Sequence, residues 1–510
     1  MVENRKIEFG DFQTPQALTT DIAGFLKKIF PHPDIIVEPT CGLGSFIKSC
    51  VLEWGDRSSY FGFDVNANYI KNIETYFRKK DNCTFEISDF FKKDWKDFFR
   101  LMSDKKILVI GNPPWVTNSA LGLLNSNNLP KKSNFQGLGG FAAKTGKANF
   151  DIAEWMLIKL LESLHGTVSC LSMLCKTATA RKVLKHAWVN RWNIHNSSLH
   201  LINAKKHFDV AVDACLLVTF ITPGKRTNDA LIYRDLSFND RICRFGIIGK
   251  ELVANIDDYN KYHQVDGISY YTWRSGIKHD AAKVMELTKK NDIYINGFGD
   301  HVDIEDVYVY PLLKSSDIAN KRLTPRRFII VTQHNAGDDT SKIKYTAPKT
   351  WDYLERYSDI LDKRKSIIYQ KRPRFSEFGV GNYSFTSWKV AISGLYKKIS
   401  FSAVGNVDNK PIMVDDTCYF IPCDSEDEAN FISNLLNSET CINFLNSLVF
   451  FDAKRPINID ILNRIDIKKL AEMNDQVETA LKYLPYAQSS MTRQQLLVFE
   501  KGQNEYQTKD

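Results

Sequence analysis

A short turn of unusual composition ends an apolar run near residue 110. Residues 107–111 (ILVIG) are typical of a buried strand, and Asn112-Pro113-Pro114-Trp115 follows directly. The Asn112 side-chain oxygen and the Pro113 carbonyl are two acceptors, and the prolines fix the backbone that presents them. Two fixed acceptors suit a planar exocyclic NH2 group, and Trp115 offers a ring on which a base can stack. The turn therefore predicts chemistry on a nucleobase amine; the alternative is an ordinary Asn-Pro turn.

A second candidate site is a glycine turn nearer the N-terminus. Residues 37–47 (VEPTCGLGSFI) place Glu38 at a strand end and Gly42 and Gly44 before a helix. Such a turn lets the backbone approach a ligand at the helix N-terminus. The third glycine of a dinucleotide-binding fingerprint is missing, because Ile47 stands there. By itself the segment is equally compatible with a plain strand-to-helix turn.

Two acidic residues at later strand ends favour the functional interpretation. Asp64 ends the run at 59–64, where a carboxylate can accept hydrogen bonds from a ribose diol. Asp89 follows the run at 84–88 and is placed to accept from the exocyclic amine of adenine. Helix capping is the simpler alternative for each aspartate. Successive strands that deliver such groups to one edge nevertheless predict a nucleotide-like cofactor.

The elements that must position these groups alternate along the first 220 residues. Apolar runs typical of buried strands lie at 34–39, 59–64, 84–88, 106–111, 166–174 and 214–221. Amphipathic stretches such as 68–80 and 151–164 lie between them. This alternation predicts an α/β fold with a mostly parallel, doubly wound sheet, whose ligands bind beyond the carboxyl ends of the strands.

Two features divide the chain further. The polar stretch 116–149 fits no regular element and predicts a mobile loop. Past residues 222–229 (TPGKRTND) the alternation ends, and we place a domain boundary near residue 225. The expected domains are 1–225, which holds the candidate sites, and 226–510, which ends in a helical tail.

Composition and charge exclude several classes of protein. The net charge of +8 permits a polyanionic partner, and the ten cysteines include no C-x-x-C pair that would suggest a zinc knuckle or disulfide framework. No run reaches the roughly 18 apolar residues of a membrane span, and no apolar secretion core follows the N-terminus. We expect a cytoplasmic protein that does not associate with membranes.

At these motifs the chain resembles the gamma-class (TaqI-type) DNA adenine-N6 methyltransferases of restriction-modification systems. Two further segments carry the resemblance, 10–19 (GDFQTPQALT) and 207–220 (HFDVAVDACLLVTF). It implies a Rossmann-like catalytic domain that transfers a methyl group from S-adenosylmethionine to a flipped-out adenine without a metal. The implied cofactor-binding residues are Thr14, Glu38, Gly42, Gly44, Asp64 and Asp89.

The resemblance also assigns the acceptor side of the reaction. Its implied catalytic residues are Asn112, Pro113, Pro114 and Trp115, with Trp115 and Phe208 stacking on the target base. From residue type alone, Phe208 would be a core residue. Trp115 stands where many relatives have tyrosine, which keeps cytosine N4 open as the target.

The second half of the chain is similar to the α+β target-recognition domains of TaqI-type enzymes. Basic and aromatic residues interleave at 322–331, 362–385, 387–398 and 450–458, which suits contacts to phosphates and base edges. The candidate DNA-binding residues are Lys131, Lys132, Arg372, Arg374, Lys454 and Arg455. The alternative for each residue is a solvated charge or an ion pair.

The expected partners follow from this reading. Double-stranded DNA is the expected substrate. The chain starts almost at its N-terminal motif, which leaves no room for a fused upstream nuclease, so a separate cognate restriction endonuclease is the expected functional partner. A monomer would suffice, because one chain carries both the catalytic and the recognition half.

Three other functions are weighed against this one. Methylation of cytosine N4 or of RNA uses the same acceptor chemistry. The protein-glutamine methyltransferases also carry N-P-P-[aromatic], but they are typically shorter and lack a large basic C-terminal half. A DNA-binding relic is disfavoured, because the cofactor turn and the catalytic turn are both intact.

Overall fold

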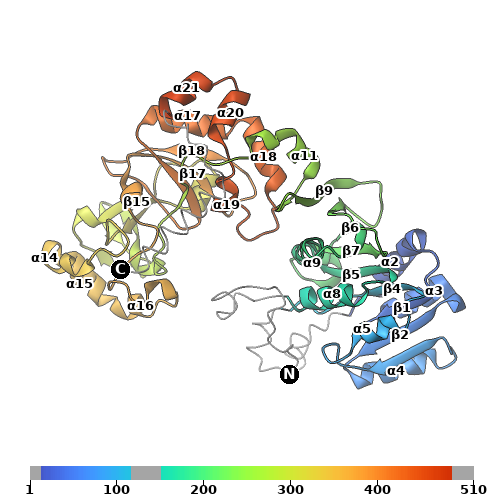
Figure 1. The fold of residues 1–510 in the computed structure, drawn as a ribbon. Coiled ribbons are helices and arrows are strands. Elements are labelled where there is room, and N and C mark those ends of the chain that lie inside the picture. Colours follow the sequence, from blue (N-terminus) through green and yellow to red (C-terminus); the bar gives the residue numbers. More distant parts are fainter. Residues whose placement is uncertain (1–12, 117–150, 485–510) are drawn as a thin grey trace. The chain divides into compact units, whose positions relative to one another are not determined.

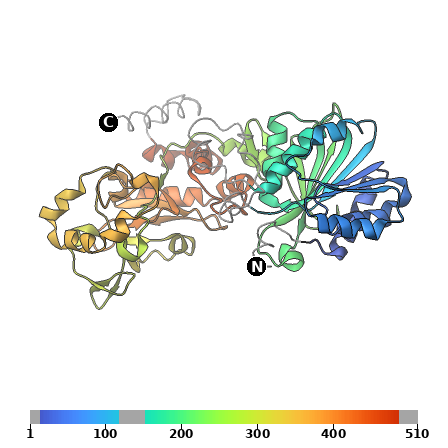
Figure 2. The same ribbon diagram turned by 90° about the horizontal axis from the view of Figure 1, so that it is seen from below.

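The computed structural model describes residues 13–116 and 151–484. The chain divides into two compact units, Met1–Asp257 and Asp258–Asp510 (Figures 1 and 2). Residues 117–149 of the expected loop and the expected tail after Leu484 lie outside the described residues, so both stay predictions.

The described part of the first unit is built around a ten-stranded sheet in the order β10-β9-β8-β6-β7-β5-β4-β1-β2-β3. Strands β3, β2, β1, β4 and β5 run parallel to one another, and β7 runs antiparallel to β5 and to β6. This arrangement confirms the predicted Rossmann-like sheet. The strands are β1 (Ile35–Glu38), β2 (Ser59–Asp64), β3 (Cys83–Ile87), β4 (Lys106–Gly111), β5 (Val168–Lys176), β6 (Ile194–Ile202), β7 (Ala214–Ile221), β8 (Asp229–Tyr233), β9 (Arg241–Ile248) and β10 (Glu251–Val253).

Helices cover both faces of the parallel part of this sheet (Figure 2). One face is packed by α2 (Gln16–Ile29), α3 (Ser45–Trp54) and α4 (Ala67–Phe77), whose apolar residues form one core cluster with β1, β4 and β5. The other face is covered by α5 (Trp95–Arg100), α8 (Ile152–Ser163) and α9 (Thr177–Val189). A short helix, α10 (Ala204–Phe208), precedes β7. Because helices cover both faces of the parallel part of the sheet, a ligand can approach it only beyond the ends of the strands.

The first unit extends further than the boundary expected near residue 225. Strand β8 pairs with β6 in parallel. Strand β9 pairs with β8, and β10 pairs with β9, both in antiparallel orientation. Arg244 of β9 forms ion pairs with Asp229 of β8 and with Asp257, which follows β10, so these ion pairs tie β8 and β9 to the end of the first unit. Residues 222–229, where the alternation of strands and helices ends, therefore connect two strands of one sheet, and the two compact units meet after Asp257.

The second unit has α+β character, with two sheets in its described part. The four-stranded sheet has the order β11-β20-β17-β18, and the six-stranded sheet has the order β14-β13-β12-β16-β15-β19. Its strands are β11 (Arg274–Ser275), β12 (Glu286–Lys290), β13 (Ile293–Ile295), β14 (His301–Val302), β15 (Val309–Leu313), β16 (Arg327–Ile330), β17 (Trp388–Ser393), β18 (Phe401–Val404), β19 (Met413–Val414) and β20 (Cys418–Cys423).

Helices of the second unit surround these sheets (Figure 1). They are α11 (Ile256–Tyr262), which begins in the first unit, α12 (Ala282–Met285), α13 (Ser315–Ala319), α14 (Ile343–Thr346), α15 (Pro348–Arg356), α16 (Ser358–Asp362), α17 (Glu426–Leu436), α18 (Glu439–Leu448), α19 (Ile459–Leu462), α20 (Ile467–Met473) and α21 (Val477–Tyr483). None of the helices in the described ranges is long and apolar enough to cross a membrane.

Candidate active site at the strand ends

The predicted catalytic turn and the predicted cofactor turn lie on neighbouring strands. Strand β1 pairs directly with β4, and β2 and β5 lie on their outer sides, so the order of connection reverses between β1 and β4. Ligands of open α/β sheets bind at such a reversal. Glu38 ends β1, and Asn112 follows β4. A Cβ built on Gly111 would lie 3.5 Å from Glu38 Cγ, so the glutamate packs beside the strand end that leads to Asn112.

Thr14 connects the two predicted functions. It is 9% exposed, and its Oγ1 accepts a hydrogen bond of 3.2 Å from Asn112 Nδ2. This bond fixes how the Asn112 amide is turned, and so the direction in which its Oδ1 acceptor points. The structure thus brings a residue predicted for the cofactor against a residue predicted for catalysis.

Gln13 makes the matching contact to the cofactor turn, and sequence analysis did not select it. Its Oε1 accepts a hydrogen bond of 3.1 Å from Leu43 N, between the two glycines of the turn. The sequence did contain one indication that Gln13 is functional, since it stands next to Thr14 in the motif at 10–19. Two adjacent residues therefore hold both turns.

The glycine turn has the backbone shape that the sequence predicts. Gly42 and Gly44 have φ values of +50° and +75°, which favour glycine. A Cβ on Gly44 would lie 1.9 Å from Ile73 Cδ1, so a larger residue there would require the Ile73 side chain to move as well as a strained backbone. Gly42 N donates to Asp64 Oδ2 at 2.8 Å, which ties the turn to the end of β2.

The strand-end aspartates also accept local backbone hydrogen bonds. Asp64 Oδ1 accepts from Asn66 N at 2.8 Å, and Asp89 Oδ1 accepts from Phe91 N at 2.9 Å. Neither aspartate caps a helix, because Asn66 is the N-cap of α4 and Asp94 is the N-cap of α5, so the capping alternative is wrong for both. Since a carboxylate oxygen has two lone pairs, these bonds leave room for a ligand's donors.

Glu38 is the most strongly perturbed carboxyl group of this site. It is 3% exposed, and its Oε2 accepts one backbone hydrogen bond, from Ile47 N at 3.3 Å. Burial raises the pKa of Glu38 well above its ordinary value, and the nearby Asp64 carboxylate raises it further. A buried carboxyl group of this kind suits a ligand that brings positive charge or hydroxyl donors.

The end of β5 holds Trp115 in place. Trp115 Nε1 donates to the Leu174 carbonyl at 3.4 Å, and the Trp115 carbonyl accepts from Lys176 Nζ at 3.1 Å. Lys176 Nζ also donates to Asp151 Oδ2 at 2.7 Å. Sequence analysis missed Lys176, because it ended this strand at Leu174, whereas β5 continues to Lys176.

The two predicted base-stacking residues lie against each other. The ring centroids of Trp115 and Phe208 are 5.2 Å apart at an interplanar angle of 64°, an edge-to-face pair. Phe208 ends α10, and Asp209 after it adopts a left-handed conformation with φ of +56°. Phe208 also packs on the core cluster, which agrees with the core interpretation; its stacking on a target base stays a prediction.

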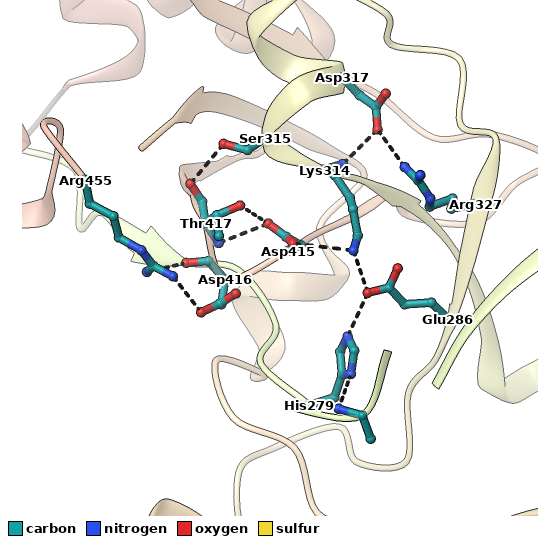
Figure 3. A network of polar contacts seen from close by, with 11 residues as sticks. His279, Glu286, Lys314, Ser315, Asp317, Arg327, Asp415, Asp416, Thr417 and Arg455 are labelled. Atoms are coloured by element: carbon teal, nitrogen blue, oxygen red, sulfur yellow. Dashed lines mark hydrogen bonds and ion pairs between the residues drawn. The ribbon is translucent and has the colours of Figure 1, made fainter. Parts of the chain in front are cut away.

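The predicted DNA-binding residues fall into three groups: residues held in ion pairs, exposed residues without an ion pair, and residues outside the described ranges. Arg374 donates to both carboxylate oxygens of Asp362 and to Glu355, and Arg455 donates to Asp416 (Figure 3). Arg372 and Lys454 are exposed, and within the described ranges neither forms an ion pair. Lys131 and Lys132 lie outside the described residues.

Comparisons with known proteins identify a close relative. The chain is 44% identical over 479 residues to the type II methyltransferase M.NspV of Nostoc sp., covering 92% of this chain and 99% of that protein. The fold of this chain resembles that of the type IIL restriction-modification enzyme MmeI, whose structure was solved in complex with DNA, with a TM-score of 0.53. The two sequences are 12% identical, and the match covers 96% of this chain and 70% of the MmeI chain. No protein-family model matches the chain.

Replacing Lys176 tests its role as a positioning residue. Lys176→Met removes the bond to the Trp115 carbonyl, and we expect kcat for methyl transfer to fall about 10-fold or more, because small misplacements of reacting groups are costly. Cofactor affinity should not change. Lys176→Arg should restore most of kcat.

A matched control separates this effect from the loss of an ion pair. Lys182 of α9 pairs with Glu154 of α8 at 3.2 Å, and in the described part of the chain it forms no hydrogen bond with Trp115. Lys182→Met should therefore keep kcat. Equal losses of kcat in Lys176→Met and Lys182→Met would contradict a positioning role for Lys176.

The raised pKa of Glu38 predicts that cofactor binding depends on pH. A cationic cofactor favours the ionised carboxylate, so binding should release a proton, and affinity should fall as pH falls through the pKa of Glu38. Calorimetry in buffers of different ionisation enthalpy measures this release. Glu38→Gln should abolish it, while the exposed Glu86→Gln should not; unchanged proton release in Glu38→Gln would refute the assignment.

Proposed function

The chain belongs to the type II methyltransferases, and from that premise we propose that it transfers a methyl group to N6 of adenine in double-stranded DNA. The observation that carries the proposal is the hydrogen bond between Asn112 and Thr14, at the reversal point of the sheet. Together with the bond from Leu43 N to the adjacent Gln13, it links an acceptor pair suited to an exocyclic amine with the turn that suits a nucleotide-like cofactor.

The methyl donor is S-adenosylmethionine, which supplies an electrophilic methyl group on a sulfonium. The residues of the site fit this group. The Gly42–Gly44 turn leaves backbone accessible before α3, and Asp64 and Asp89 offer carboxylates for hydroxyl and amine donors. Buried Glu38 suits a cofactor that carries positive charge.

On the acceptor side, the residues of this chain would bind and polarise the base. Asn112 Oδ1 and the Pro113 carbonyl would accept the two hydrogens of N6, so that electron density gathers on the nitrogen. The N6 lone pair would then form the new N–C bond as the S–C bond breaks, which leaves a neutral thioether and moves the positive charge from sulfur to N6. N6 would afterwards release one proton to water. No side chain has to act as a strong base, because the positive charge makes this proton acidic.

The base would enter between Trp115 and Phe208. Two rings in direct contact have centroids about 4.5–7 Å apart, so a base between them requires a wider separation than the present 5.2 Å. Trp115 is held by Leu174 and Lys176, whereas Phe208 lies at the end of a five-residue helix. We therefore assign the movement to Phe208.

The second unit is proposed to bind the DNA around the target base. Arg372 and Lys454 are the best candidates from its sequence, since their charges face solvent, and Lys131 and Lys132 remain candidates in the segment outside the described residues. A separate restriction endonuclease is the proposed functional partner. The enzyme would act as a monomer in the cytoplasm.

Cytosine N4 is the second candidate acceptor. The observation that favours it is Trp115, at a position where many adenine-specific relatives have tyrosine. Both bases present a planar NH2 group to the same two acceptors, so the reaction would be unchanged and only the shape of the base pocket would select between them.

Sequencing of methylated genomes tests the proposal. We expect the wild-type chain, expressed in a bacterial host without DNA methyltransferases, to place N6-methyladenine at one short sequence, detected by single-molecule sequencing. Asn112→Ala should leave that sequence unmodified, because loss of a preorganised polar contact in the transition state lowers kcat by about 10²- to 10³-fold. N4-methylcytosine at the site would establish the second candidate.

Binding measurements complete this test. The purified Asn112→Ala variant should bind S-adenosylmethionine and DNA with affinities close to wild type, since Asn112 acts on the base amine. A variant that still methylates DNA at the wild-type rate would contradict the role of the turn. Loss of cofactor binding together with turnover would show that Asn112 supports the cofactor turn instead.

Arg372 and Arg374 provide a matched pair on one segment. Arg372→Ala should weaken DNA binding and lower the slope of log K against log salt by about 1, as expected for a lost phosphate contact. Arg374→Ala should leave that slope unchanged and lower the melting temperature instead, because Arg374 is committed to Asp362 and Glu355. The reverse pattern in salt dependence would contradict this assignment.

A further inference from the structure

The loop between α13 and β16 gathers three arginines around one carboxylate. Asp317 of α13 is 5% exposed, and its carboxylate oxygens lie 3.3 Å from Arg326 Nη2, 3.7 Å from Arg322 Nη2 and 3.9 Å from Arg327 Nη1. Figure 3 shows Asp317 with Arg327 and the Lys314 backbone. We call Arg322, Arg326 and Arg327 the arginine cluster.

The arginine cluster carries an excess of positive charge. One carboxylate compensates one of its three guanidinium groups, and none of the three contacts a second carboxylate among the described residues. Arg374 shows the opposite arrangement, with one guanidinium between two carboxylates. The cluster therefore keeps a local charge of about +2, by the formal charges of its four groups.

The arginine cluster is also accessible. The side chains of Arg322, Arg326 and Arg327 are 50%, 65% and 42% exposed, while Asp317 below them is buried. Each guanidinium has five N–H donors in a planar fork, and most of those donors are not used by Asp317. Such forks match the oxygens of a phosphate group in charge and geometry.

The loop that presents the cluster is fixed by the protein itself. Asp317 accepts from Lys314 N at 3.1 Å at the start of α13, and Arg322 N donates to the Asp317 carbonyl at 2.9 Å. Leu323, between the arginines, packs against a core cluster of the second unit. Because the arginines are gathered before any ligand arrives, binding loses less conformational freedom.

We propose that the arginine cluster of Arg322, Arg326 and Arg327 is a binding site for the phosphodiester backbone of DNA. This inference rests on the proposed function and adds a site to it. Phosphate contacts of this kind contribute affinity and orientation rather than sequence recognition. The cluster is accordingly expected to act on any DNA duplex, whether or not it contains the target sequence.

Salt-dependent DNA binding tests the cluster. Affinity of the full chain for a random-sequence duplex and for a methylation substrate is measured between 50 and 200 mM salt, about the range in which phosphate contacts dominate. Arg322→Ala and Arg326→Ala should each weaken binding to both duplexes equally and lower the salt slope by about 1, and the double variant by about 2. Arg326→Lys should keep the slope, because the charge remains.

Arg234→Ala is the matched control. The Arg234 side chain is 67% exposed, and the Arg326 side chain is 65% exposed, so the two are equally accessible. Unlike Arg326, Arg234 forms a one-to-one ion pair with Asp240 at 2.7 Å. Its loss should leave the salt slope unchanged. Melting temperatures and S-adenosylmethionine binding confirm that each variant is folded.

The outcomes separate this inference from the proposed function. If wild type binds and methylates DNA but the slopes of Arg322→Ala and Arg326→Ala equal the wild-type slope, the cluster does not bind phosphate and the proposed function stands. If the variants lose affinity only for the duplex with the target sequence, the cluster reads bases and the inference is wrong. If wild type binds no DNA at all, the proposed function itself fails.

Discussion

A methyl group moves only between atoms that are nearly in contact, so the turn proposed to receive the cofactor and the turn proposed to receive the base must be held side by side. In this chain the constraint is met by two adjacent residues near the N-terminus. Gln13 bonds the glycine turn after β1, and Thr14 bonds Asn112 after β4. Because β1 and β4 are neighbours at the reversal of strand order, both turns open at one point on the sheet edge.

The remaining parts of the site depend on this arrangement. Strand β5 lies next to β4, and its last residues hold Trp115 through its indole and its carbonyl. Strand β7 pairs with β5, and Thr177 N donates to the Asp213 carbonyl in the segment between Phe208 and β7. Trp115 is therefore fixed relative to the same strand ends that hold the proposed cofactor turn, and the segment that follows Phe208 is anchored there at Asp213.

Sequence patterns predicted the parallel strands because β1, β4 and β5 are short apolar runs buried on both faces, while the edge strand β3 is largely exposed and was predicted from its alternation with helical stretches. They missed β6, whose His195, Asn196, Ser197 and Ser198 interrupt the pattern. The structure shows why these residues are tolerated: the pairing with β7 shifts register there, and Ser197 Oγ lies 2.8 Å from Thr219 Oγ1 in a buried pair.

Among the site residues, the positions of those at strand ends were predictable, since strand order sets where they lie. Lys176 and Gln13 were not, because their roles arise from tertiary contacts. For the same reason, counting charges could not separate Arg374 and Arg455, which are paired, from Arg372 and Lys454.

The central claim is that the Asn112–Trp115 turn presents an exocyclic base amine to S-adenosylmethionine. The most direct measurement is to incubate the purified chain with unmethylated duplex DNA and S-adenosylmethionine labelled in its methyl group, digest the DNA, and identify the labelled nucleoside by mass spectrometry. The label is predicted on N6 of deoxyadenosine. Label on a ring carbon, or on protein or RNA but never on DNA, would contradict the account.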